Sequence, residues 1–380
     1  MIHETKYQAA RSVALPVESH FTRHLAEARQ AGEQDLAPAP PAQAIADIVD
    51  TTFWASLRRE EGRSPKISLA YLSPSQAGQP LLFERPLPLT PAMLTKLAPA
   101  VERPGIHLGV WQQAEQLVIW GTTREIPGIC LVVEVIEPGL LVIKHRRLEG
   151  LGKFVNVAVL KGDQVKVVDE RSAHLPDCPV LLTSLLGLVP SPARHDSVNV
   201  LVQLAVSMRA HGRGGSLLVV PSGTTDWRAS ILHPISYSVQ PAFSGLADLL
   251  SRDPGERSQL QWQGAMRQAI ESVAGLTAVD GATVLSDQHE VLAFGAKIGR
   301  PEGNRPIDQI IVTEPIVGNK PVVIHPAQHG GTRHLSSAQF VNDQRDAYAL
   351  VASQDGRFTI FGWSPCEKMV HAHRIDTLLL

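Results

Sequence analysis

The feature that most constrains the fold is a short apolar run, GSLLVV at 215–220. Both of its alternating faces are apolar, and a strand of this kind is typical of a sheet that is covered on both sides. An amphipathic helix is expected just before it, with Asp196 as a candidate N-cap and Gly212 just past the helix end. The second half of the chain therefore predicts a sheet with helices packed against it.

The segments that follow extend this pattern. A second helix is expected at 259–276, and two pairs of strands are expected at 278–296 and 346–362. A polar turn from Ser286 to His289 joins the strands of the first pair. Helices that alternate with hairpins predict a mixed sheet in an α/β domain.

The first half of the chain predicts a second, smaller α/β domain. A helix is expected at 42–60, where apolar residues recur at helical spacing. Segments rich in β-branched residues predict strands at 66–74, 117–123, 129–147 and 154–170.

We therefore expect two α/β domains with a Pro-containing joint at 187–196. Residues 1–42 end in an Ala- and Pro-rich stretch and are expected to form an N-terminal extension with a stiff linker. The smaller domain is assigned to 43–190, with a regulatory or interaction role, and the larger one to 191–365. Residues 366–380, which include the sequence HAHR, are expected to form an exposed tail.

The composition argues against several classes of protein. The hydrophobic share of 44% and the charged share of 19% are ordinary for a soluble globular protein. The net charge of −2 and the lack of basic–aromatic interleaving argue against partners such as nucleic acid or an anionic membrane. The sequence shows no membrane span or secretory signal, and its three scattered cysteines show neither a disulfide framework nor a zinc-type spacing. A cytoplasmic protein is expected.

Two polar clusters lie at the ends of predicted strands in the larger domain. The first, Asp280–Ala282, places a carboxylate beside backbone that a ligand can approach closely. The second, Gly330–His334, offers backbone N–H groups, a hydroxyl and a guanidinium, which together suit a phosphate chain. A helix that begins near Leu335 would add the attraction of its N-terminal dipole. Each cluster alone is explained as well by a turn or a surface ion pair, but together they predict a polyphosphate site.

In their order and context, these segments resemble the diadenylate cyclase (DAC) domain over about residues 195–363. The helix and Gly-rich turn that lead into the apolar strand at 215–220 are similar to that family. Its Asp-Gly-Ala motif matches Asp280–Ala282, and its Gly-Thr-Arg-His motif matches Gly331–His334. The strand that ends in Ser-Glu-Glu in the family is similar to DAYALVASQDG at 346–356.

The resemblance implies that the larger domain binds ATP or another adenine nucleotide. In the family, two domains face each other in a homo-oligomer and condense two ATP molecules into cyclic di-AMP and pyrophosphate. The implied catalytic residues are Asp280, Arg333 and His334, and Asp280 and His334 would hold a divalent metal, Mg²⁺ or Mn²⁺. The implied nucleotide-binding residues are Gly281, Ala282, Gly331, Thr332, Arg333 and Ser353.

The chain departs from the family pattern at several positions. Leu335 replaces an arginine, Ser336 and Ser337 replace alanines, and Gln354 replaces a glutamate that helps to hold the metal. Glutamine lacks the anionic oxygen that a hard cation prefers. The neighbouring carboxylate, Asp355, would point to the opposite face of the strand.

These departures resemble the DAC-like nucleotide sensors of the DACNV group, so two hypotheses stay open. The chain is either a diadenylate cyclase or a catalytically degenerate sensor of a nucleotide or second messenger that signals through its first domain. A purely structural interaction module would leave the presence of both motifs unexplained.

Overall fold

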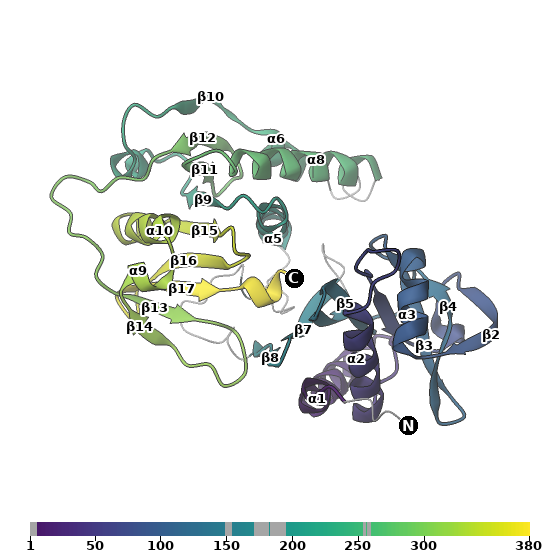
Figure 1. Ribbon diagram of the computed structural model, residues 1–380. Coiled ribbons are helices and arrows are strands. Elements are labelled where there is room, and N and C mark those ends of the chain that lie inside the picture. The colour runs from purple at the N-terminus through teal and green to yellow at the C-terminus, as the bar shows by residue number, and fades with distance from the viewer. Residues whose placement is uncertain (1–5, 149–153, 171–181, 183–194, 254–255, 257–259) are drawn as a thin grey trace. The chain divides into compact units, whose positions relative to one another are not determined.

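The computed structural model describes residues 6–148, 154–170, 182, 195–253, 256 and 260–380 (Figure 1). The chain divides into two compact units, Met1–Val168 with Leu380 and Asp169–Leu379. Each unit contains helices and a mixed β-sheet, which confirms the predicted two-part α/β fold. The predicted boundary at 190 lies outside the described residues.

In the first unit, eight described strands form one sheet in the order β2-β4-β3-β1-β5-β6-β7-β8. The strands are β1 Ser68–Tyr71, β2 Leu81–Pro88, β3 His107–Gln113, β4 Gln116–Thr123, β5 Leu131–Glu137, β6 Leu140–Arg146, β7 Phe154–Lys161 and β8 Gln164–Val167. β1 pairs with β3 in parallel, and the other neighbouring pairs are antiparallel.

The described helices of this unit are α1 Gln8–Gln30, α2 Ala42–Ser56 and α3 Pro91–Leu97, with 3₁₀ turns at Pro74–Gln76 and Ala98–Val101. The apolar face of α1 is fully buried in the same core as α2 and the sheet, through side chains such as Val17, Phe21 and Leu25. Most of the first forty residues therefore belong to this unit rather than to an extension. The Ala- and Pro-rich stretch lies between α1 and α2 and is not helical, and α2 begins directly after Pro41.

In the second unit, nine described strands form a sheet in the order β10-β12-β11-β9-β15-β16-β17-β13-β14. The strands are β9 Gly215–Val220, β10 Tyr237–Phe243, β11 Ala282–Ser286, β12 Val291–Ala296, β13 Ile310–Thr313, β14 Val322–Ile324, β15 Tyr348–Ala352, β16 Phe358–Ser364 and β17 Met369–Arg374. The β9–β11 and β13–β17 pairs are parallel, and the other pairs are antiparallel.

The described helices of this unit are α5 His195–Ala210, α6 Gly245–Leu250, α8 Leu260–Leu276, α9 Pro326–His329 and α10 Thr332–Asp343, with 3₁₀ turns at Asp226–Ser230 and Asp376–Leu378. α5 and α10 lie on opposite sides of β9 and β15 in Figure 1. Every residue of β9 is buried, so the prediction of a strand covered on both faces is confirmed. Both predicted hairpins, β11–β12 and β15–β16, are present as well.

Two expectations differ from the structure. Residues 369–374 are not part of an exposed tail, because they form β17 between β16 and β13, where Val370 and Ala372 pack in the core. α5 begins at His195, so Asp196 lies in its first turn rather than before it. None of the described helices has the length and apolar character needed to cross a membrane.

Candidate functional sites

The second sheet brings the predicted motif residues to one edge. β9 and β11 are parallel, with Ser216 opposite Ala282, while β15 is antiparallel to β9, with Ala352 opposite Gly215. The segments before β9 and β11 and the segment after β15 therefore meet at the same edge. α10 packs along β15 and is joined to it by a short connection, so the N-terminus of α10 also faces this edge.

Arg333 lies against the backbone that precedes β9. A Cβ atom on Gly214 would come within 2.9 Å of Arg333 Nη1 and 3.2 Å of the carbonyl oxygen of Ala352. Gly214 also has a φ of +71°, a conformation that other residues rarely adopt. Because Gly214 has no side chain, the guanidinium of Arg333 has room to lie at this edge of the sheet.

Asp280 lies at the same edge and is 87% exposed. Its carboxylate forms an ion pair and hydrogen bond with Lys297. The hydrogen bond and charge of Lys297 hold the pKa of Asp280 below its ordinary value, and the charge of Arg333 acts in the same direction. The carboxylate and the guanidinium from the two motifs are therefore close enough to interact electrostatically.

Gly281 is crowded by its own chain. Its φ is +116°, and an added Cβ would lie 2.4 Å from the carbonyl carbon of Gly295 on β12. The sequence predicts that this glycine lets a ligand approach the backbone. The structure gives a different reason for it, because packing between β11 and β12 already requires glycine here.

Thr332 is the first residue of α10 and is exposed, with Gly331 at the N-cap position. The helix thus begins three residues earlier than expected from the sequence. Ser353 forms part of the β15–β16 turn, where its backbone N–H donates to the carbonyl oxygen of Arg357 at 2.8 Å. The side-chain amide of Gln354 donates to the carbonyl oxygen of Arg213 at 3.3 Å, which ties this turn to the loop before β9.

Asp355 lies in the turn and not on a strand. Arg357 Nε is 3.3 Å from its carboxylate. A hydrogen bond from Ser353 holds the pKa of Asp355 below its usual range. The expected position on the opposite strand face is therefore wrong, and the nearest charged partner of this carboxylate is an arginine on its own turn.

His334 is buried, with 4% of its surface exposed. Its ring lies edge-on to those of His329, at 5.4 Å between centroids, and Phe361, at 6.1 Å. Burial lowers the pKa of His334, against the opposing influence of the Asp355 carboxylate. His334 thus belongs to the layer between α10 and the sheet.

A divalent metal shared by Asp280 and His334 stays a prediction, and the geometry is unfavourable to it. The carboxylate of Asp280 is already paired with Lys297, and the imidazole of His334 is buried. Hard cations such as Mg²⁺ are bound through several oxygen ligands. At Gln354 the chain supplies an amide that is bonded to backbone instead of a carboxylate.

The sequence reasoning missed two residues at this edge, Lys297 and Tyr237. Lys297 directly follows β12, and the pairing of Ala282 with Ala296 places it near Asp280. The hairpin register could have revealed this position. Tyr237 is 50% exposed and stacks on Phe294 at 4.7 Å between centroids, and its ring lies beside Gly295. It comes from β10, which the sequence did not predict.

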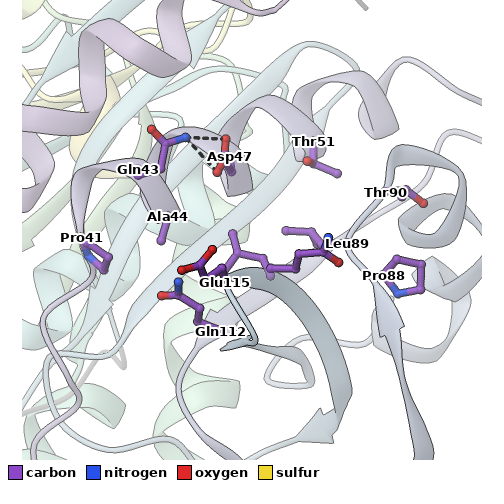
Figure 2. Close-up of a pocket in the computed structure, with 12 residues that line it drawn as sticks. Pro41, Gln43, Ala44, Asp47, Thr51, Pro88, Leu89, Thr90, Gln112 and Glu115 are labelled. Carbon is purple, nitrogen blue, oxygen red and sulfur yellow. Dashed lines mark hydrogen bonds between the residues drawn. The ribbon is translucent and has the colours of Figure 1, made fainter. Parts of the chain in front are cut away.

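A second candidate site is a groove in the first unit, with a volume of about 690 Å³ (Figure 2). Three segments line it: the N-terminal part of α2, the connection between β2 and α3, and the β3–β4 hairpin. Its lining residues are Pro41, Gln43, Ala44, Asp47, Thr51, Pro88, Leu89, Thr90, Gln112, Glu115, Gln116 and Leu117.

Two carboxylates, three amides and two threonines supply the polar groups of the groove beside five apolar residues, and no cationic side chain is among its lining residues. Gln43 Nε2 donates to both carboxylate oxygens of Asp47 at 2.9 Å, which fixes one wall. Figure 2 shows Gln112 and Glu115 of the hairpin across from these two side chains of α2. Two acidic groups and several amides favour a ligand that is neutral or cationic and rich in hydrogen-bonding groups.

Residues 34–124 match the family described as "Probable sensor domain DACNV". No curated protein matches the chain. The match lies within the first unit, whereas the DAC resemblance rests on motifs of the second. All residues that line the groove fall inside the segment that is similar to this probable sensor domain.

Proposed function

We propose that the chain is a two-part sensor. The first unit binds a small neutral or cationic ligand in the groove, and the second unit binds an adenine nucleotide at the sheet edge formed around Arg333. The observation that carries the proposal is the coincidence of the groove with the segment matched to a sensor family.

The nucleotide part of the proposal is supported by charge. Arg333 and Lys297 lie at an edge where α10 also presents its N-terminus, and all three attract phosphate oxygens. Asp280 would then compete with the phosphates for Lys297 or accept a hydrogen bond from the ribose. The exposed ring of Tyr237 offers a face on which a base could stack.

The second candidate function is the condensation of two ATP molecules into cyclic di-AMP. It is favoured by the proximity of Asp280 to Arg333, which brings together two motifs that are distant in sequence. The replacement of a glutamate by Gln354 leaves fewer oxygen ligands for a metal, so we propose binding without turnover as the function. A homo-oligomer and the divalent metal belong to this second candidate.

One experiment separates the two. The purified chain is incubated with ATP and Mn²⁺, cyclic di-AMP is measured by mass spectrometry, and ATP binding is measured in parallel by calorimetry. We expect ATP binding without product. Product that disappears in Asp280→Asn would establish the cyclase instead, and Gln354→Glu tests whether the missing carboxylate is what prevents turnover. Absence of ATP binding would contradict both functions.

A further inference from the structure

A further pocket, with a volume of about 580 Å³, lies in the second unit. β13 and β17 are parallel, while β16 is antiparallel to both β15 and β17, so β13, β15 and β17 begin at the same edge of the sheet. The loop before β13, the connection from α10 to β15 and the β16–β17 turn line the pocket at this edge. Arg333 lies at the opposite edge, near the end of β15, so this pocket is separate from the candidate nucleotide site.

The loop that carries Arg305 is held in place by α10. Gln339 on that helix accepts a hydrogen bond from the backbone N–H of Ile307 at 2.8 Å and donates one to the carbonyl oxygen of Arg305 at 3.2 Å. The side chain of Ile307 is buried in the core of the unit. Because this wall of the pocket is fixed by the protein itself, a ligand would lose less free energy to the ordering of the loop.

Amide groups, and not cations, hold the carboxylate of Asp343. Asn304 Nδ2 and Gln339 Nε2 each donate to it at 2.9 Å, and Asn342 Nδ2 donates at 3.4 Å. Asp343 is the last residue of α10, where the helix dipole disfavours a negative charge. These amides therefore stabilise the carboxylate without using the cations that line the pocket.

Three cations from three different segments line the pocket, namely Arg305, Arg345 and Lys368. All three are exposed, and none of them forms an ion pair with a residue in the described part of the chain. The guanidinium of Arg345 lies over the ring of Trp363, 4.0 Å from its centroid. A guanidinium stacked on an aromatic ring keeps its N–H groups at the rim of its plane, where they can bind two oxygens of one carboxylate or phosphate.

We propose that this pocket binds a small organic anion through a carboxylate or phosphate group. Arg345 would bind two oxygens of that group, and Arg305 and Lys368 would add positive charge around it. With Asp308 and Asp343, the lining has three positive and two negative side chains, so its net charge is +1 and favours a small anion over a highly charged polyanion. This site does not depend on the proposed function, because it shares no residue with the groove or with the candidate nucleotide site.

The site is tested on the full chain by NMR with isotope-labelled methionine methyl groups. Met369 lines the pocket, and Met369→Leu assigns its signal, whereas Met93 lies in the first unit. Inorganic phosphate and succinate are titrated separately at constant ionic strength, with chloride as the balancing anion. We expect a saturable shift of the Met369 signal with one of them or both, and none at Met93, and the probe that binds identifies the group that is recognised. A Met369 signal that moves with neither probe, or moves without saturation, would overturn the proposal.

Matched variants identify the cations that bind. Lys368 has a φ of 52°, a left-handed conformation that asparagine adopts more readily than lysine, so the fold should tolerate Lys368→Asn. This change should weaken binding by about two- to fivefold, as expected for an exposed ion pair. Lys320→Asn, at an exposed lysine outside the pocket, should have no effect. Arg345→Lys keeps the charge but loses the fork and should weaken binding about tenfold.

Asp308→Asn tests the opposite direction. It removes a negative charge from the lining and should strengthen binding by about two- to fivefold. An affinity that is the same in the wild type, Lys368→Asn and Arg345→Lys, or that falls in Asp308→Asn, would show that these cations do not form an anion site.

Discussion

The two candidate sites differ in the sign of their charge. The groove of the first unit carries the carboxylates of Asp47 and Glu115 among amide side chains. The sheet edge of the second unit carries Arg333 and Lys297 beside the carboxylate of Asp280. Because like charges repel and buried unpaired charges are costly, the two sites should select different ligands. A phosphorylated compound suits the edge, and a neutral or cationic compound suits the groove.

The two sites also differ in how their backbones are built. At the edge, the positive φ angles of +71° and +116° are taken by Gly214 and Gly281. At the rim of the groove, the β3–β4 turn places Ala114 and Glu115 at φ angles of 45° and 67°. Residues with a Cβ are strained in this region. At the edge, glycine therefore allows backbone and side chains to pack closely without strain. In the β3–β4 hairpin, Glu115 has a strained backbone conformation and places a carboxylate at the tip.

The largest expected effect comes from filling the space at the edge. Gly281→Val should destabilise the second unit by about 3 kcal/mol, because the added side chain combines a disfavoured φ with overlap on Gly295. Hydrogen–deuterium exchange followed by peptide should show faster exchange in β11 and β12 and no change in β5 to β7.

Gly303→Val is the matched control for this variant. Gly303 has a φ of +85°, and nothing lies within 4 Å of an added Cβ. Gly303→Val should therefore lower the stability only through its disfavoured backbone conformation, by about 1–2 kcal/mol. If Gly281→Val costs no more than Gly303→Val, the close approach of β12 is not what requires glycine at the edge.

The second prediction tests the difference in charge. Arg333→Ala should weaken ATP binding by about 10- to 100-fold, since a hydrogen bond to a charged group contributes roughly 1.5–3 kcal/mol. Asp47→Asn, which changes the groove, should leave ATP affinity unchanged. Calorimetry at one fixed ionic strength measures both. An ATP affinity that responds to Asp47→Asn and not to Arg333→Ala would reverse the assignment of the two sites.

The elements of both sheets were predictable where local signals are strong. β9 is apolar on both faces, and the β11–β12 and β15–β16 hairpins have polar turns between β-branched runs, so their sequences specify them. β17 was mistaken for a tail because its histidines look polar. In the structure His373 Nδ1 and Thr313 Oγ1 lie 2.8 Å apart in a buried hydrogen bond, and this pairing cannot be read from local sequence.

The candidate sites were predictable only in part. The motifs indicated Asp280 and Arg333, and the structure brings these two near each other. Lys297 and the burial of His334 depend on the strand register and on helix packing, which the motif pattern does not contain. The groove was missed because it is assembled from three separate segments, none of which has a chemical motif of its own.

The third prediction compares two buried histidines under acid conditions. Burial lowers the pKa of His329 from 6.5 to about 4 and that of His20 to about 2. The unfolded state therefore binds more protons than the folded state below pH 6.5, and stability falls as the pH falls. The contribution of His329 should be lost between pH 6.5 and about 4, by on the order of 2 kcal/mol after allowance for solvent.

Urea unfolding at a series of pH values measures this loss. In His329→Gln the decline between pH 6.5 and 4 should be shallower, whereas below pH 4 the first unit should go on losing stability because of His20. Exchange measured by peptide assigns each loss to its unit. A decline that is the same in His329→Gln and in the wild type would mean that other groups control the acid sensitivity of the second unit.

The smallest expected effect concerns the strained rim of the groove. Glu115→Gly relieves the left-handed conformation, which costs about 1–2 kcal/mol for a residue with a Cβ, but it also raises the entropy of the unfolded chain by about 0.5–1 kcal/mol. The net gain in stability should therefore be roughly 0.5 kcal/mol, seen as slower exchange in β3 and β4. Glu115→Gln keeps the strain and removes only the charge, so its stability should equal that of the wild type. If Glu115→Gly is more stable than the wild type and Glu115→Gln is not, the turn keeps a strained residue at position 115. This result is expected if the carboxylate of Glu115 serves ligand binding rather than folding.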